Sequence, residues 1–228
     1  VRISADNSIT IITPAAEMGQ GSMTGVPVAL AEELDADWSK VTLEMAPAEP
    51  KIYGYNTMRR GRPGKLMGIF GSRAVMKYFD QMRMAGAQAR KVLLINAANK
   101  WGVAVSSLKT EPSVVIHPPS GRRMTYGEIA AFARIPAKIP TVAKGELKKK
   151  SAFRIIGKPV PRRDIPEKVN GTAMFSIDVQ VPGMVYASTV HGTVQQGTPL
   201  SWNEEAVKAL TGIIATVKLK HGVAVVAD

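Results

Sequence analysis

The sequence of 228 residues contains no cysteine. Disulfides, thiolate-bound iron–sulfur clusters and thiol nucleophiles are therefore excluded from this chain, and any redox chemistry needs a cofactor bound by other groups. The sequence also lacks an apolar run of the roughly 20 residues that a membrane-spanning helix needs, and no charged-then-apolar signal segment opens it. We therefore expect any membrane association to come through a partner.

Acidic residues are scarce relative to basic ones, with 18 Asp and Glu against 30 Lys and Arg, and the formal net charge is +12. This charge favours an anionic partner. A nucleic acid, an acidic protein face and a phosphorylated cofactor all meet that description, and the charge does not choose among them. The only three histidines are His117, His191 and His221, and none has a second ligand at metal-binding spacing. We expect them at turns or on the surface, and we predict no metal site made of protein side chains.

Hydrophobic periodicity predicts helices and strands throughout the chain. Strands are expected at 1–5, 8–13, 41–45, 173–179, 184–190, 213–219 and 222–226, with a hairpin at 114–124. Helices are expected from Gly21 to Leu34, from a Ser72 cap to about Lys100, over 125–132 with a Thr125/Glu128 capping box, and at 204–210. A linker rich in Pro and Lys occupies 135–150. We predict an α+β (α/β) fold with two domains, 1–156 and 157–228, that meet near Gly157.

The turn between the strand at 8–13 and the following helix carries the most chemistry. Gly19 and Gly21 permit positive φ and close backbone approach, and a helix start presents unpaired N–H groups to an anion such as a phosphate. Gln20 adds a carboxamide that both donates and accepts hydrogen bonds. A plain strand-to-helix turn is the simpler alternative for a lone Gly-x-Gly pattern.

A second candidate of the same kind is Gly71-Ser72-Arg73. A serine at a helix start, with a glycine before it and an arginine after it, can hold a phosphate through its hydroxyl, the backbone N–H groups and the charge. The alternative is an ordinary N-cap with a solvated arginine. Glu32 and Glu33 are expected to face water, because consecutive acids on an amphipathic helix usually do, and the run 148–150 of three lysines is expected to be a solvated linker.

The stretch from Arg59 to Lys65 contains the Arg-Gly-Arg-Pro core of an AT-hook, whose arginines enter the minor groove of A·T-rich DNA. A DNA-binding module is therefore the chief rival hypothesis. Against it, this stretch lies between two well-patterned elements, and no helix-turn-helix or zinc-finger spacing accompanies it. A non-catalytic fragment that only shapes an interface is the third hypothesis.

Several spaced motifs together resemble the xanthine dehydrogenase and aldehyde oxidase family of molybdenum hydroxylases. They are Glu17-Met18-Gly19-Gln20-Gly21 with Ala31-Glu32-Glu33-Leu34, the stretches 78–83, 85–90 and 125–128, 156–162 with Asp164, 168–173, and Pro182-Gly183-Met184. Their order is most similar to the large (beta) subunits of isoquinoline 1-oxidoreductase and of membrane-associated aldehyde dehydrogenases. The likeness covers nearly the whole chain.

The resemblance implies a molybdopterin-binding segment followed by an incomplete α/β hammerhead-like domain. It implies a molybdopterin with molybdenum, in some relatives as the cytosine dinucleotide, contacted by Met18, Gly19, Gln20 and Gly21 and by Gly71, Ser72 and Arg73. It also implies hydroxylation of an aldehyde or an electron-poor heterocycle with water as the oxygen source. Electrons would pass to [2Fe–2S] clusters on a small partner subunit and then to a c-type cytochrome, in the periplasm or at the periplasmic face of the inner membrane.

Two features depart from the family pattern. The segment 65–70 replaces the small Gly/Thr-rich lead-in expected before Gly71, and the general-base glutamate of the family belongs to a C-terminal part that this sequence does not contain. Both ends of the sequence also look cut, so we expect it to be a piece of a longer subunit and name no catalytic residue in it.

Overall fold

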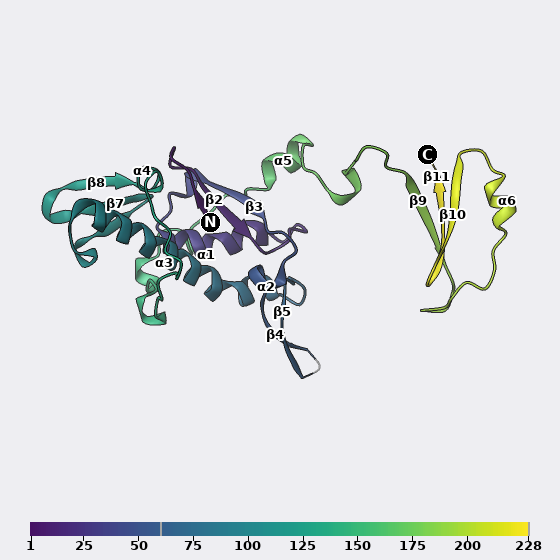
Figure 1. Cartoon of the computed structure of the whole chain (residues 1–228), viewed down its shortest axis with the longest axis horizontal. Coiled ribbons are helices and arrows are strands. Elements are labelled where there is room, and N and C mark those ends of the chain that lie inside the picture. Colours follow the sequence, from purple (N-terminus) through teal and green to yellow (C-terminus); the bar gives the residue numbers. More distant parts are fainter. Residues whose placement is uncertain (60, 228) are drawn as a thin grey trace. The chain divides into compact units, whose positions relative to one another are not determined.

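The computed structural model describes residues 1–59 and 61–227, which form two compact units, Val1–Thr172 and Ala173–Asp228. Figure 1 shows the course of the chain and the labels of its elements.

The first unit is built on a three-stranded sheet in the order β1-β2-β3. The strands are β1 (Arg2–Ile3), β2 (Ile9–Thr13) and β3 (Val41–Met45). β1 and β2 are antiparallel, whereas β2 and β3 are parallel and joined by the helix α1 (Ser22–Leu34). Every second residue of β2 is buried, as expected for a strand with one face on a core.

The long helix α3 (Arg73–Trp101) packs along α1. The contact is close at Gly86, where a Cβ atom would lie 2.2 Å from the carbonyl oxygen of Leu30. The core of the unit contains Ile9, Ile11, Leu30, Leu34, Tyr78, Leu93 and Ile129 among its buried side chains. Helix α1 thus packs against β2 and β3 of the sheet and against α3, and the helix layer made of α1 and α3 carries both predicted cofactor loops at its helix starts.

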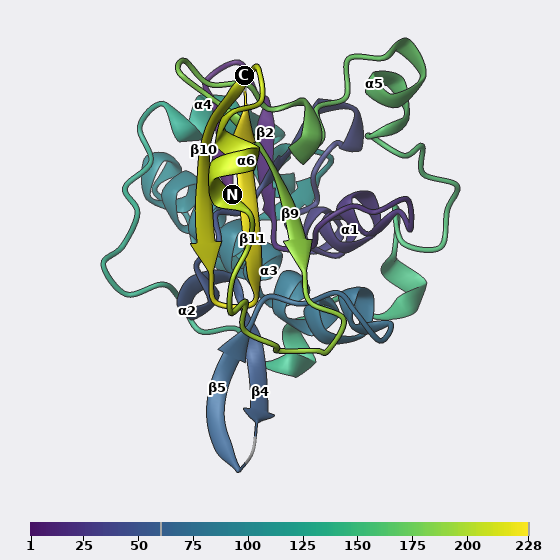
Figure 2. The same cartoon turned by 90° about the vertical axis from the view of Figure 1, so that its right-hand side faces the viewer.

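Smaller elements complete the first unit. A second sheet has the order β6-β7-β8, made of β6 (Lys109–Glu111), β7 (Val114–His117) and β8 (Arg122–Thr125), and α4 (Tyr126–Ala130) follows it. The predicted capping box of Thr125 and Glu128 is confirmed. The hairpin of β4 (Tyr55–Arg59) and β5 (Arg62–Leu66) follows the short α2 (Pro50–Tyr53) and projects from the body of the unit (Figures 1 and 2). The short α5 (Ile165–Asn170) lies near its end.

The second unit is a three-stranded antiparallel sheet in the order β10-β11-β9, with α6 (Glu204–Lys208) against β10 (Figure 2). Its strands are β9 (Tyr186–His191), β10 (Ile213–Leu219) and β11 (Gly222–Ala227). The strand predicted at 173–179 is wrong: this stretch contains only a 3-10 turn, Ser176–Asp178. Its apolar residues are exposed, because no neighbouring strand pairs with them.

The expected mixture of helices and strands is confirmed as an α+β architecture of several small sheets. The contacts of the chain divide it between Thr172 and Ala173. In the described residues we find no helix with the length and apolar character that crossing a membrane requires.

Candidate functional site

The glycine loop before α1 is organised around the carboxylate of Glu17. Its oxygens accept hydrogen bonds from the backbone N–H groups of Gly19 (2.7 Å), Gly21 (2.9 Å) and Met23 (3.1 Å). Desolvation by burial, the largest single effect, raises the pKa of Glu17, but these hydrogen bonds outweigh it and hold the pKa below its ordinary value. Three amides around the loop predicted to bind a cofactor anion therefore donate to a carboxylate of the chain itself.

Gln20 closes the same loop. Its side-chain oxygen accepts from the N–H of Met18 at 2.6 Å, and its Nε2 donates to the carbonyl of Ala16 (2.8 Å) and to the hydroxyl of Ser22 (2.6 Å). Glycines at φ 101° (Gly19) and 81° (Gly21) permit the tight path that these bonds require. The loop is thus a rigid feature whose most exposed large side chain is Met18, at 74%.

Arg162 holds the loop from outside. Its guanidinium donates to the carbonyl of Gly19 at 2.9 Å and lies 3.3 Å from the Glu17 carboxylate. Asp164 fixes the guanidinium through a bond of 2.6 Å, and Lys168 in turn lies 2.6 Å from Asp164. The hydrogen bond from Arg162 lowers the pKa of Asp164 far below its ordinary value, so this chain of charges stays ionised.

The second predicted loop leads into α3 and is more open. Gly71 and Ser72 are both left-handed, at φ 63° and 57°. Ser72 occupies the N-cap position, but its side chain makes no capping hydrogen bond, so the predicted serine cap is wrong in that respect. The Arg73 guanidinium lies over the ring of Phe70, 4.9 Å from its centroid. The first turn of this helix therefore keeps the positive end of its dipole free of any side-chain acceptor among the described residues.

The two helix starts lie at the same end of the unit, because α1 and α3 run parallel. A groove of about 330 Å³ is lined by Gly21 and Gly25 from the start of α1 and by Val75 and Phe79 from the start of α3. At the opposite end, Arg90 of α3 reaches the residue that ends α1. The structure thus brings 18–21 and 71–73 to one end of the helix layer, as a common site requires.

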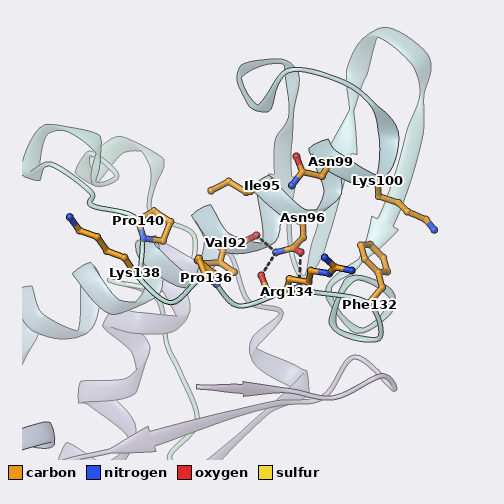
Figure 3. Close-up of a pocket in the computed structure, with 10 residues that line it drawn as sticks. All are labelled: Val92, Ile95, Asn96, Asn99, Lys100, Phe132, Arg134, Pro136, Lys138 and Pro140. Carbon is orange, nitrogen blue, oxygen red and sulfur yellow. Dashed lines mark hydrogen bonds between the residues drawn. The ribbon is translucent and has the colours of Figure 1, made fainter.

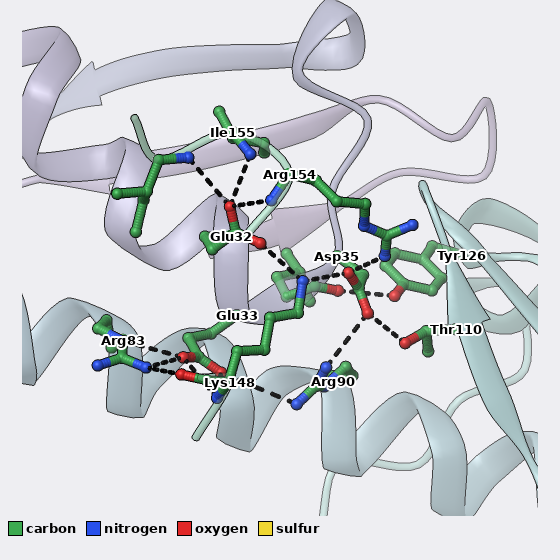
Figure 4. A network of polar contacts seen from close by, with 12 residues as sticks. Glu32, Glu33, Asp35, Arg83, Arg90, Thr110, Tyr126, Lys148, Arg154 and Ile155 are labelled. Atoms are coloured by element: carbon green, nitrogen blue, oxygen red, sulfur yellow. Dashed lines mark hydrogen bonds and ion pairs between the residues drawn. The ribbon is translucent and has the colours of Figure 1, made fainter. Parts of the chain in front are cut away.

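The end of α1 carries a buried polar network, shown in Figure 4. Glu32 is fully buried, and one of its oxygens accepts from the backbone N–H groups of Arg154 (2.9 Å), Ile155 (2.7 Å) and Ile156 (3.0 Å). Its other oxygen accepts from the ammonium of Lys148 at 2.8 Å. Burial is the largest single effect and raises the pKa of Glu32, but these hydrogen bonds outweigh it and keep the pKa below normal.

The neighbouring acids complete this network. Glu33 accepts two hydrogen bonds from Arg83, at 2.9 and 2.7 Å. Asp35 ends α1 in a left-handed conformation and pairs with Arg90 at 3.2 Å and with Lys148. The expectations that Glu32 and Glu33 face water, and that Lys148 belongs to a solvated run, are therefore wrong. Cationic side chains of α3 and of residues 148–154 pair with these acids and so offset the cost of burying their charges.

Residues 148–164, which we call the strap, connect the two ends of α1. The strap begins at the Glu32 network and ends with Arg162 at the glycine loop and the N–H of Arg163 on the hydroxyl of Thr24 (3.0 Å). The sequence of this stretch predicts a solvated linker at 148–150 and contributes to the family resemblance, but no local pattern predicts that it connects the two ends of α1. The isolated Arg-x-Asp at 162–164 is too common a pattern to mark it.

A phosphorylated pterin fits the residues at this end of the layer. The α3 start offers amides without a side-chain cap, and Met18, Phe70, Val75 and Met76 expose large apolar surfaces beside the two loops. Such exposed apolar groups next to an anion-favouring helix end suit a flat heterocycle with an anionic tail. Among the described residues no three His, Asp or Glu side chains gather at metal-binding distance, so metal would have to come with the cofactor.

The AT-hook stretch lies in the β4–β5 hairpin, except for Arg60, which lies outside the described residues. Asn56 to Met58 pair with Pro63 to Lys65, so this backbone is already hydrogen-bonded in a sheet. His117 is buried at the turn that ends β7, against the hydroxyl of Ser120, whereas His191 and His221 are exposed or partly exposed in the second unit. Of the two placements expected for His117, the turn is therefore confirmed and the surface is wrong.

The chain belongs to the family described as the molybdopterin cofactor-binding domain, whose sequence profile matches residues 1–181. It is 40% identical, over 99% of its length, to the beta subunit of isoquinoline 1-oxidoreductase from Brevundimonas diminuta. It is 31% identical, over 93% of its length, to the membrane-bound aldehyde dehydrogenase (pyrroloquinoline-quinone) of Gluconacetobacter polyoxogenes. The identity to a nicotinate dehydrogenase subunit from Pseudomonas putida is 25% over the full chain.

These matches confirm the predicted resemblance to molybdopterin-binding large subunits. The chain spans only 32%, 26% and 19% of the lengths of these three relatives. It therefore corresponds to one part of each of these longer relatives.

Proposed function

We propose that this chain is part of the molybdopterin-binding subunit of a molybdenum hydroxylase that oxidises aldehydes or N-heteroaromatic compounds. One observation carries the proposal: in a member of the molybdopterin cofactor-binding domain family, the parallel packing of α1 and α3 puts two glycine-preceded helix starts at the same end. That end combines uncapped backbone donors with exposed apolar side chains.

The two loops have different roles in this proposal. The α3 start, with Gly71, Ser72 and Arg73, binds an anionic phosphate of the cofactor through backbone N–H groups and the serine hydroxyl. The α1 loop, with Met18 to Gly21, presents a rigid edge against the pterin, because Glu17 and Gln20 already occupy its inner amides. Arg162 keeps that edge in place.

The bound cofactor would supply a metal centre that accepts electrons from the substrate while water supplies the oxygen. Because this chain has no cysteine, [2Fe–2S] clusters that receive the electrons would belong to a small partner subunit, with a c-type cytochrome as the further acceptor. We propose a periplasmic location, with any membrane contact made by such a partner. The catalytic base is expected in the remaining part of the large subunit.

The test is metal and cofactor analysis of the full-length subunit purified with its partner subunits. We expect stoichiometric molybdenum and a fluorescent pterin after acid release. Because one relative is named for pyrroloquinoline quinone, the same extract is assayed for that quinone. A preparation that holds quinone and no molybdenum, or neither group, would overturn the proposal, and the latter result would favour the non-catalytic assembly hypothesis.

A duplex-binding assay distinguishes the proposed enzyme subunit from the alternative, a DNA-binding module. We expect no salt-sensitive preference of the full-length subunit for A·T-rich duplex, because the backbone of residues 62–65 is paired within a hairpin, whereas an AT-hook binds as a free extended strand. Tight binding that is lost in Arg62→Ala, in a preparation without molybdenum, would favour the DNA module.

For the site itself, Gln20→Ala is expected to weaken cofactor retention about tenfold, as for supporting partners of metal sites, without unfolding the subunit. The reason is that the carboxamide makes three bonds that shape the loop. Molybdenum per subunit after dialysis is the measurement, and Gln180→Ala, at an exposed position in the second unit, is the matched control. Normal metal content and full activity in Gln20→Ala would refute the role of this loop.

A further inference from the structure

A second groove lies on the side of α3 that faces away from α1, between the last turns of the helix and the extended segment 132–140 (Figure 3). Its volume is about 490 Å³. Val92 and Ile95 line the helix side, and Phe132, Pro136 and Pro140 line the other side. The proposed cofactor end of α3 is at the opposite end of the helix, and this groove shares no lining residue with the groove there.

The groove is held in shape by the carboxamide of Asn96, which is buried at 8% exposure. Its Oδ1 accepts from the N–H of Arg134 at 2.8 Å, and its Nδ2 donates to the carbonyls of Val92 (2.9 Å) and Arg134 (3.2 Å). Farther along, the Gln88 side chain donates to the carbonyl of Pro140 at 3.3 Å. Asn96 and Gln88 therefore fasten the irregular segment to the helix at two points, and Pro136 and Pro140 restrict its backbone. The space between the segment and the helix is thus formed without a ligand.

The charges around this groove have one sign. Lys100, Arg134 and Lys138 line it, and no acidic residue does. Within the described residues none of these three cations forms an ion pair, whereas Arg83, Arg90 and Lys148 on the opposite side of α3 are all paired with buried acids. The Lys100 ammonium instead lies over the ring of Phe132, 5.3 Å from its centroid. The groove therefore offers an apolar floor with unneutralised cations at its rim.

We propose that this groove binds an extended acidic segment of another protein chain, with apolar side chains on the floor and carboxylates at the cationic rim. An extended strand alternates its side chains, which suits a floor and a rim that differ in polarity. A peptide fits better than a nucleic acid, because most of the floor is aliphatic or proline and its one aromatic ring already has the Lys100 ammonium over it.

The test is a fluorescence-anisotropy titration of the full-length subunit with a labelled ten-residue peptide of alternating glutamate and valine. We expect saturable binding that weakens as salt rises. The same peptide with glutamine in place of glutamate is expected to bind at least about tenfold more weakly, because the carboxylates are its contacts with the rim. Undetectable binding of the acidic peptide, or equal binding of both peptides, would overturn the proposal.

The variant that tests the location is Lys100→Ala with Lys138→Ala. Both side chains line the rim, and their loss is expected to weaken peptide binding about fivefold to tenfold. Its matched control is Lys218→Ala with Lys220→Ala, which removes the same charge from exposed positions of the second unit. Equal losses in both variants would show a diffuse charge effect and no defined groove.

A third variant, Ile95→Asn, changes the floor without changing charge and is also expected to weaken binding by several fold, because it replaces apolar contact. Circular dichroism of each variant checks that the fold is retained. If A·T-rich duplex or heparin binds more tightly than the peptide and is lost in the same Lys100/Lys138 variant, the groove is a polyanion site and the peptide proposal is overturned.

Discussion

Glu17 and Glu32 stand at opposite ends of α1, and each accepts hydrogen bonds from three backbone N–H groups. Glu17 binds amides two, four and six residues away in the sequence, whereas Glu32 binds amides that are 122 to 124 residues away. Both have a pKa held below its ordinary value, Glu17 by these backbone bonds and Glu32 by the hydrogen bond from Lys148 together with its backbone bonds. A carboxylate that accepts three backbone hydrogen bonds thus closes a local loop at one end of the helix. At the other end, a carboxylate of the same kind binds the strap, which is distant in the sequence.

The difference in range decides what each carboxylate stabilises. A local set of bonds fixes a few residues and can open by itself, without unfolding the core. A long-range set opposes the chain entropy of a large loop, so its loss releases the strap and exposes buried cations. We therefore expect Glu32 to affect global stability and Glu17 to affect mainly the shape of the candidate site.

The largest effect is expected for Glu32→Ala. It leaves three backbone N–H groups in the interior without their acceptor and leaves Asp35 as the remaining partner of the Lys148 ammonium, a loss on the order of 3–5 kcal/mol in the free energy of unfolding. Urea denaturation of the full-length subunit measures it. The control is Glu111→Ala, whose exposed pair with Arg123 should contribute far less. Similar losses in the two variants would mean that the buried network adds little stability.

The next effect is expected where α1 and α3 touch. Gly86→Ala puts a methyl group 2.2 Å from the Leu30 carbonyl oxygen, so the helices must separate at a cost of about 1–3 kcal/mol. Gly25→Ala on α1 meets no atom within 4 Å and should stabilise the helix by up to about 1 kcal/mol. Thermal denaturation of the two variants shows whether close packing of the helices or helix propensity determines the change in stability. A stable Gly86→Ala would mean that the helices are less tightly packed.

The pH dependence of stability should also follow the carboxylates. The pKa of Asp35, like that of Glu32, is lowered: burial is the largest effect and raises it, but hydrogen bonds from Lys148 and Thr110 outweigh that effect. A lowered folded-state pKa gives stability that is present above the unfolded-state pKa and is lost as pH falls through the folded-state pKa. The unfolding free energy should therefore be nearly constant from about pH 7 to 5 and fall below about pH 4.5. The fall should be less steep in Glu32→Gln, and an unchanged slope there would contradict the assignment.

Much of the fold could be predicted because its signals are local. The periodicity around Leu30 and Leu34 indicated α1, and Thr125 with Glu128 indicated the capped start of α4. The strand expected at 173–179 failed because a period-two pattern does not reveal whether a partner strand is present. The roles of Glu32 and Lys148 could not be predicted either, because local sequence favours solvent for both and only a contact over more than a hundred residues overrides that preference.

For the candidate site, the sequence indicates the two glycine-preceded helix starts but not that they lie next to each other in space. That 18–21 and 71–73 share one end depends on the parallel packing of α1 and α3, which no local pattern encodes. The sequence also predicted free amides in the first loop. It did not identify Glu17 as their acceptor, although a carboxylate two residues before a Gly-x-Gly turn is a signal that an Asx-like local bond can form.

The smallest effect on global stability is expected for Glu17→Gln, and it tests the local side of the comparison most directly. Glutamine keeps the size of the side chain but removes the charge that attracts Arg162 and three amides, so the loop should open while the core stays folded. Amide hydrogen exchange of residues 16–24 should become faster, with little change over α3. Because Arg162 bridges the loop and the strap, residues 160–164 should exchange faster as well. If Glu17→Gln instead lowers the unfolding free energy as much as Glu32→Ala does, the glycine loop is part of the cooperative core, and the distinction between a local and a long-range carboxylate is lost.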